Sequence, residues 1–226
     1  MPAQLHLLNS ANQISHVKRK IESTFVQGLA SIEALIKVSN VDVVVYRDSR
    51  LVIPETGVGG YSPSHDRVFI AVDPEHSSFE EHFERNFISI LGHELHHCAR
   101  WMMPGYGTTL KEAIVSEGLA CHFETELCDG TVPFYAQCLD NQEQIQVLTE
   151  FENSCNSPAY DHAAWFYGSG YLPRQAGYSL GFAIVAAYIA VHGFPASKLT
   201  NLPADEFFTT PPNKWFKPFA SHTGTG

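Results

Sequence analysis

Basic residues are scarce in this 226-residue chain, which has 14 Lys and Arg against 24 Asp and Glu and a formal net charge of −10. The longest run of basic residues is only three residues long, Lys18-Arg19-Lys20. Proteins that bind nucleic acids or anionic membrane surfaces present clustered positive charge to the phosphates. The charge balance therefore argues against a nucleic-acid partner and against docking on an anionic membrane.

The five cysteines include no C-x-x-C pair, and their number is odd. A zinc ribbon needs paired cysteines and a disulfide framework needs an even set, so both are disfavoured. Free cysteines on apolar helical positions pack as small hydrophobic side chains, and free thiols are typical of a reducing compartment. We therefore expect a cytoplasmic protein whose cysteines are structural.

Long apolar runs are also missing. Residues 1–20 contain no continuous apolar segment after a basic start, so they do not resemble a secretory signal. The most apolar stretch, residues 180–191, is too short to span a bilayer and is expected to form a buried helix. We expect no membrane insertion and a single domain over residues 1–226, with residues 221–226 as a disordered tail.

The segment His93-Glu94-Leu95-His96-His97 fits the pattern H-E-x-x-H. Residues four apart on a helix lie one turn apart on the same face, so His93 and His97 can both reach one Zn²⁺. Glu94 then stands close to the metal without being a ligand, where it can act as general base on a water molecule. The spacing predicts two ligands and a base, to which a third ligand must be added.

Twelve histidines make a chance match to this motif easier than usual, but the motif lies in a predicted helix over residues 79–100. Ser77 or Ser78 can cap this helix, and acidic residues favour its first turn. Its apolar residues recur near the helical period: Phe83, Phe87, Ile90, Leu91, Leu95 and Cys98. The context favours a true metal site. His96 lies about 100° around the helix from His97, so we expect it behind the ligands or at the surface.

A second helix, predicted over residues 108–127, carries the candidate third ligand, Glu117. A turn through residues 104–107 would return this helix antiparallel to the first. Gly118 costs about 1 kcal/mol relative to alanine within a helix, which indicates close packing of the two helices. A solvated position for Glu117 stays open. The alternative ligands are Glu112, His122, Glu124 and Glu126, of which Glu124 shares the face of Glu117, and Glu112 also fits a capping box after Thr108 or Thr109.

Three segments in this order, HELHH, then SEGLA at 116–120, then LPRQAGYSLGFAIV at 172–185, resemble the DUF2268 family of predicted zinc-dependent proteases. The similarity extends over most of residues 40–192. It implies a zincin-like fold and a gluzincin-type site in which His93, His97 and Glu117 hold one zinc ion and Glu94 is the base. Phe182 stands where the late segment often has a tyrosine, so the resemblance implies no role for that position.

A metallopeptidase also needs a donor that stabilises the oxyanion, and the glycine- and proline-rich segment 168–178 is a suitable place for one. We expect this segment to be a loop that leads into a helix. Tyr178, at the start of that helix, is the preferred donor, and Arg174 is the second candidate. The alternative is that Tyr178 only packs in the core.

Periodicity along the chain predicts an α+β fold. Besides the two helices already described, we expect helices at residues 12–37, 133–152, 178–192 and 204–208. The expected strands cover residues 41–46, 51–53 and 66–73. Residues 153–170 are expected to be a loop. A small mixed sheet would pack on the HExxH helix, in agreement with a zincin-like architecture. Extended peptides often pair with a sheet edge, so the 66–73 strand or a flexible lip at residues 57–61 could bind substrate; a plain hairpin is the alternative.

The sequence thus predicts a soluble zinc metallopeptidase that acts on a peptide or protein. Glu94 would activate a water molecule and then pass the proton to the leaving amine. Two alternatives stay open: a non-catalytic metal-binding or partner-binding protein on the same fold, and a zinc hydrolase of a small amide. Nothing in the sequence indicates the oligomeric state or the substrate.

Overall fold

The computed structural model describes residues 3–216 of the chain, so the predicted tail at 221–226 lies outside the described residues. Its strands are β1 (Gln4–Leu8), β2 (Asp42–Arg47), β3 (Val58–Ser64) and β4 (Arg67–Val72). Its α-helices are α1 (Lys18–Glu33), α2 (Phe79–Met102), α3 (Leu110–Leu127), α4 (Asn141–Ser154), α5 (His162–Tyr167), α6 (Ala176–His192) and α7 (Ala196–Leu199). Short 3₁₀ helices are η1 (Phe134–Ala136), η2 (Ala204–Thr209) and η3 (Pro212–Lys214).

The described residues form two compact units, each built from several stretches of chain. The first comprises residues 3–106, 120–132 and 195–202, and the second comprises residues 107–119, 133–194 and 203–216. Helix α3 runs without a break from residues of the second unit into residues of the first. The single domain expected from the chain length stays a prediction.

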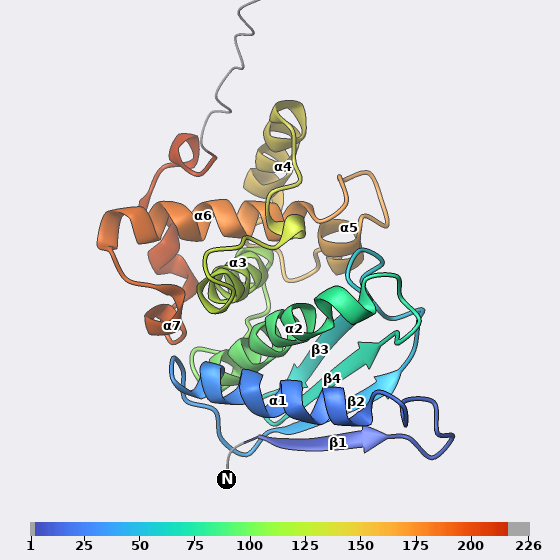
Figure 1. The fold of residues 1–226 in the computed structure, drawn as a ribbon. Coiled ribbons are helices and arrows are strands. Elements are labelled where there is room, and N and C mark those ends of the chain that lie inside the picture. Colours follow the sequence, from blue (N-terminus) through green and yellow to red (C-terminus); the bar gives the residue numbers. More distant parts are fainter. Residues whose placement is uncertain (1–2, 217–226) are drawn as a thin grey trace, which may run out of the picture. The chain divides into compact units, whose positions relative to one another are not determined.

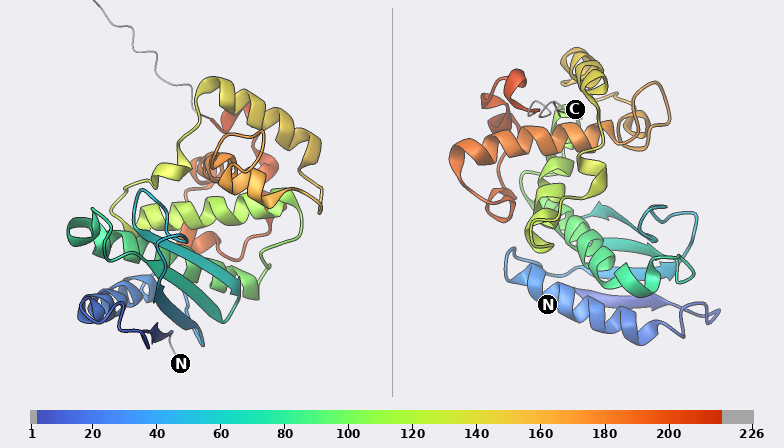
Figure 2. Two further views of the ribbon diagram at one scale, coloured as in Figure 1. Left: turned by 90° about the vertical axis from the view of Figure 1, so that its right-hand side faces the viewer. Right: turned by 45° about the horizontal axis from the view of Figure 1, so that its top comes forward.

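The first unit contains a four-stranded mixed sheet in the order β1-β2-β4-β3. β1, β2 and β4 are parallel, while β3 pairs antiparallel with β4 and forms one edge. Helices α1 and α2 lie side by side on one face of this sheet (Figures 1 and 2), and α2 packs on β3 and β4. Its core includes the fully buried Val43, Val45, Val68 and Ile70. The α+β class with a small mixed sheet is confirmed, and it is compatible with a zincin-like fold.

Three strands differ from the prediction, and one of them, β1 at Gln4–Leu8, was not expected at all. Residues 51 and 52 form a bend and residue 53 has no regular structure, whereas most of the segment 57–61, expected to be a flexible lip, belongs to the edge strand β3. A Cβ on Gly59 would lie 2.3 Å from the carbonyl oxygen of Leu51. The glycine therefore lets the 51–53 segment cross closely over β3. The predicted strand at 66–73 is present as β4, but it is an interior strand and not the edge.

Helix α2 begins at the predicted residue and continues to Met102, two residues beyond the predicted end. Ser78 is its N-cap residue but makes no side-chain cap bond; its Oγ lies 2.8 Å from Nδ1 of His76. Helix α3 begins at Leu110, and the predicted role of Glu112 at its start is confirmed. The Glu112 carboxylate accepts hydrogen bonds from the backbone N–H groups of Thr108 and Thr109, both at 2.9 Å.

The second unit is organised around α6, which contacts η1, α4, α5 and η2. Most residues of the predicted apolar helix are buried, because α6 is apolar on nearly all sides. Gly118 of α3 and Gly181 of α6 meet closely, since a Cβ on Gly118 would lie 2.2 Å from the Gly181 carbonyl oxygen. The packing reason expected for Gly118 therefore exists, but the helix that it approaches is α6 and not α2. Among residues 3–216, no helix combines the length and the apolar character that a membrane crossing requires.

The remaining differences concern helix ends. The helix predicted at 12–37 begins later and ends earlier, at Lys18 and Glu33. The helix predicted at 133–152 is divided into η1 and α4, because Asp140 starts α4 with a capping box to Glu143. The loop predicted at 153–170 contains the short helix α5.

Candidate metal centre

His93, Glu94 and His97 lie in the C-terminal half of α2, and all three residues are buried. Ligand atoms of His93, His97 and Glu117 all lie within 4.8 Å of one another, and each residue is only 5–6% exposed. The predicted ligands are thus brought together as a possible metal-binding group. Two imidazoles and one carboxylate are a donor set that zinc prefers, and catalytic sites combine three such ligands with an open position.

Helix α3 supplies the carboxylate. Glu117, Cys121 and Glu124 are separated by four and three residues, so they lie on one face of the helix. The Glu124 carboxylate is 1% exposed, and its Oε1 lies 2.7 Å from Nδ1 of His93. The shared face of Glu117 and Glu124, expected from their spacing, is therefore the face that meets the histidines.

Glu124 holds the ring of His93 from behind. Ser89, one turn before His93 on α2, donates a hydrogen bond to the second oxygen of the same carboxylate. Histidine ligands commonly donate their other ring N–H to a carboxylate, which fixes the tautomer and the ring orientation. With Nδ1 held by Glu124, the ring presents Nε2 to a metal. Glu124 was weighed as an alternative ligand, and its contact with His93 favours a supporting position instead.

A second group of donors, His93, Cys121 and Glu124, also lies within 4.8 Å. In this group, the Glu124 carboxylate and the His93 imidazole already contact each other at 2.7 Å. The two nitrogens of one imidazole point in opposite directions, so this group stands behind His93 relative to His97 and Glu117. The first group therefore fits a metal ion better than the second.

The charges of the buried residues fit a divalent cation. Glu94, Glu117 and Glu124 are all buried, and ligand atoms of Glu117 and Glu124 lie within 4.8 Å of an imidazole nitrogen. Burial of several carboxylates is costly unless positive charge compensates them. A metal ion ligated by His93, His97 and Glu117 would supply that charge.

Glu94 is fixed by contacts with the edge strand. The Ser62 hydroxyl of β3 donates a hydrogen bond to the backbone carbonyl of Glu94 at 2.9 Å. A Cβ on Gly60 would lie 2.7 Å from both Cγ and Oε1 of the Glu94 side chain. The missing side chain at position 60 therefore makes room for the carboxyl group of the predicted base.

The other candidates from the sequence have different surroundings. His96 is fully buried, with Nε2 3.3 Å from the Thr200 hydroxyl and its ring against Phe123, so a surface position for it was wrong. Glu126 accepts two hydrogen bonds from Ser197. Among the described residues, the two possible metal-binding groups contain none of four other candidates: His96, Glu112, His122 and Glu126.

The predicted oxyanion donors lie around the start of α6. Tyr178 is half-buried, and its ring lies 5.1 Å from the rings of both Tyr135 and Phe166. Arg174 is exposed in the preceding segment. The aromatic contacts of Tyr178 fit the packing alternative, and the donor roles of Tyr178 and Arg174 stay predictions.

Two tyrosines near the ligands were not singled out from the sequence. The ring of Tyr106 lies 5.5 Å from the ring of His97. Burial, followed by the nearby negative charges of Glu117 and Glu112, raises the pKa of Tyr160. Neither tyrosine lies in a recognisable motif, so their positions depend on how the turn at 103–107 and the segment before α5 fold.

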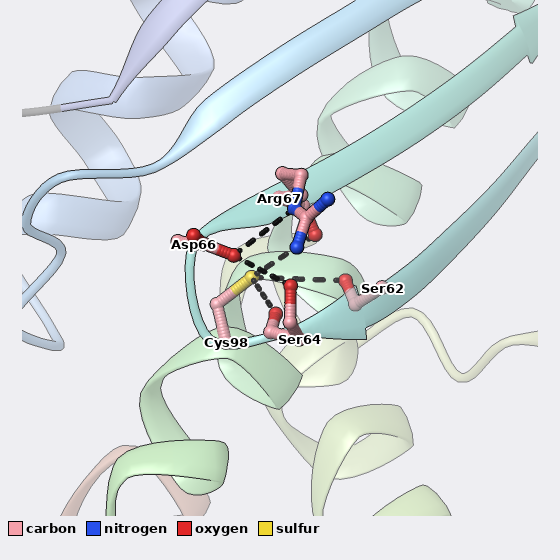
Figure 3. Close-up of polar contacts among 5 residues, drawn as sticks. All are labelled: Ser62, Ser64, Asp66, Arg67 and Cys98. Carbon is pink, nitrogen blue, oxygen red and sulfur yellow. Dashed lines mark hydrogen bonds and ion pairs between the residues drawn. The ribbon is translucent and has the colours of Figure 1, made fainter.

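Cys98 follows His97 directly but has a structural environment (Figure 3). Its thiol donates to the carbonyl oxygens of Ser64 and Arg67, at 3.5 and 3.7 Å. Burial raises the pKa of the Cys98 thiol to about 12. A neutral thiol is a poor nucleophile and a poor metal ligand. The expectation that this cysteine packs as a structural residue agrees with these contacts.

The sheet, the HExxH helix and the buried group of two histidines and one glutamate fit the class of zincin-like metalloproteins. A family model described as predicted Zn-dependent protease (DUF2268) matches residues 21–209. The chain therefore belongs to this family. No curated protein and no solved structure matches the chain.

Proposed function

We propose that this protein is a zinc-dependent peptidase whose site is formed by His93, His97, Glu117 and Glu94. The observation that carries the proposal is the buried group of His93, His97 and Glu117, with Glu94 beside it on the same helix. Family membership supports it. When held by such residues, zinc supplies a Lewis acid that lowers the pKa of a water molecule and polarises a carbonyl group.

The protein's own residues then have separate tasks. Glu94 accepts a proton from the attacking water and passes it to the leaving amine. Ser62 and Gly60 hold the Glu94 backbone and leave room for its carboxyl group. Glu124 keeps His93 oriented. A hydroxyl or guanidinium donor, with Tyr178 and Arg174 as candidates, would stabilise the oxyanion.

The edge strand β3 offers a place for the substrate backbone. Among residues 3–216, β3 pairs only with β4; it packs on α2, and Gly60 lies close to the Glu94 side chain. An extended peptide that adds to this edge would pass close to the carboxyl group of the base. This arrangement favours a peptide over a small amide, although a zinc amidase and a non-catalytic metal-binding protein remain the alternatives to test.

The test is cleavage of casein and of a peptide library by the zinc-loaded protein and by Glu94→Gln. We expect wild type to cleave, and Glu94→Gln to retain zinc while its rate falls at least about 10²-fold, since the amide cannot accept the proton. Zinc retention without cleavage by either protein would support the non-catalytic alternative. Equal cleavage by both proteins would contradict the role of Glu94.

A further inference from the structure

The end of α2 and the turn after it expose a run of large apolar side chains. Trp101, Met102 and Met103 are 37%, 70% and 64% exposed, and Pro104 follows them, also exposed. Runs of consecutive exposed apolar residues are unfavourable unless they serve binding. The rings of Trp101 and Tyr106 stack within this region, with centroids 5.8 Å apart and planes 23° apart. We call these two rings the aromatic platform.

The aromatic platform adjoins the candidate metal centre. Trp101 follows His97 by four residues on the same helix, so it continues the row of His93 and His97 by one more turn. Tyr106 then packs its ring against His97, with ring centroids 5.5 Å apart and a 65° angle between the planes. A side chain that rests on the aromatic platform would therefore lie next to a predicted zinc ligand.

The turn that carries Tyr106 is held in place. The backbone N–H of Gly105, at φ +106°, donates to the Arg100 carbonyl at 2.9 Å. A glycine adopts this backbone conformation without strain. Arg100 is buried, and its guanidinium donates to the carbonyl oxygens of Thr200 and Leu202 at 2.9 Å each. The aromatic platform is therefore organised before a ligand arrives, which lowers the entropic cost of binding.

We propose that the aromatic platform binds an apolar side chain, preferentially an aromatic one, of the peptide substrate next to the bond that is cleaved. The proposal rests on the proposed peptidase function and names its substrate class. The exposed part of Trp101 and the half-buried ring of Tyr106 offer apolar area and ring-to-ring contacts to such a side chain. The position beside His97 is the reason for choosing a substrate over a second copy of the chain as the occupant.

Binding of two matched hydroxamates to the zinc-loaded protein tests this inference without relying on catalysis. Glycine hydroxamate and phenylalanine hydroxamate share the metal-binding group and differ only by a benzyl group. The ratio of their dissociation constants, measured by calorimetry, isolates the contribution of the benzyl group. Zinc content is measured for each variant, so that loss of metal is not mistaken for loss of the aromatic platform.

We expect wild type to bind the phenylalanine compound at least about tenfold more tightly, since a single methylene group in a hydrophobic pocket already discriminates by about 10–200-fold. Trp101→Ala and Tyr106→Ala should bring the ratio close to one. Trp101→Phe and Tyr106→Phe keep an aromatic ring and should retain most of the preference. Phe194→Ala, which removes another exposed aromatic side chain, should leave the ratio unchanged.

A ratio near one in wild type, or the same ratio in Trp101→Ala, would overturn the inference while leaving the peptidase proposal intact. If neither hydroxamate bound the zinc-loaded wild type, the zinc would lack the open position that a peptidase needs, so the proposed function would fail and the inference with it. If Trp101→Ala changed the oligomeric state in sedimentation equilibrium without changing the ratio, the aromatic platform would be an interface between copies.

Discussion

At the scale of single residues, Glu124 orients the ring of His93, a proposed metal ligand. Its carboxylate is buried, bonds His93 Nδ1 at 2.7 Å and is held in turn by Ser89. Removing the partner of a ligating histidine typically costs 10–100-fold in metal affinity. We therefore expect Glu124→Ala to lower zinc affinity by about 10–100-fold in a chelator competition assay.

The matched control is Glu126→Ala on the same helix, because Glu126 bonds Ser197 and no predicted ligand. It should leave zinc affinity unchanged. Glu124→Gln, whose amide oxygen can still accept from Nδ1, should recover part of the loss. Equal zinc affinity in wild type and Glu124→Ala would show that His93 needs no support from Glu124.

Gly60 is predicted to protect the geometry of the base. A methyl group at this position would lie 2.7 Å from Glu94 Oε1 and 2.6 Å from Ile90 Cγ2. Gly60→Ala should therefore displace the Glu94 carboxyl group and lower the cleavage rate by at least about tenfold, because small displacements of a catalytic group are costly. Zinc content should stay at the wild-type level, since Glu94 is not a ligand.

Gly170→Ala is the control for Gly60→Ala, because the nearest atom to its added Cβ is the Ala164 Cβ at 3.2 Å and its backbone is unstrained. It should leave the rate close to wild type. Full cleavage activity in Gly60→Ala would mean that the Glu94 carboxyl group acts from another position.

The thiol of Cys98 should titrate only at very high pH. Burial raises its pKa to about 12, whereas an unfolded cysteine has a pKa near 8.5. Its contribution to stability is therefore complete below about pH 8.5 and is lost as pH rises toward 12. We expect iodoacetamide at pH 8.5 to modify the exposed Cys138 in the native protein and Cys98 only after unfolding, as read by peptide mass spectrometry. Rapid native alkylation of Cys98 would contradict its burial.

At the scale of elements, the contact between α3 and α6 depends on two glycines. A Cβ on Gly181 would lie 2.2 Å from the Ile114 carbonyl oxygen, and a Cβ on Gly118 would meet the Gly181 backbone. Because these are backbone atoms, the helices must separate to accept a methyl group. Gly118→Ala and Gly181→Ala should each lower the free energy of unfolding by about 1–3 kcal/mol, despite the higher helix propensity of alanine. Denaturant unfolding checks this, and a gain in stability would contradict the close contact.

The helices that carry the ligands could be predicted because their signals are local. The apolar period around residues 79–100 and the Glu112 cap before α3 lie within a few residues of the structure that they specify. β1 and β3 could not be predicted in this way. β3 contains Gly59, Gly60 and a proline, and its strand geometry depends on pairing with β4 and on the crossing segment at Leu51. The local amino-acid composition of a segment does not indicate pairing of this kind with a distant part of the chain.

At the scale of the whole molecule, the order of motifs along the chain predicted the family and the metal-binding group. His93 and His97 follow from helical spacing alone, while Glu117 was preferred from its place on the returning helix, with Glu124 on the same face left as an alternative. The contact between Glu124 and His93, the Tyr106 ring against His97 and the room at Gly60 could not be predicted, because each joins residues that are distant or separated by an irregular turn. The sequence thus indicates the ligands better than the residues that position them.

The most direct test of the central claim is the zinc content of the purified protein, measured by elemental analysis for wild type, Glu94→Gln and Glu117→Ala. The account predicts one zinc ion per chain in wild type and in Glu94→Gln, and much less in Glu117→Ala, because Glu117 is a proposed ligand and Glu94 is not. A wild-type protein that holds no metal after zinc is supplied, or a Glu117→Ala variant that holds one zinc ion as firmly as wild type, would contradict it.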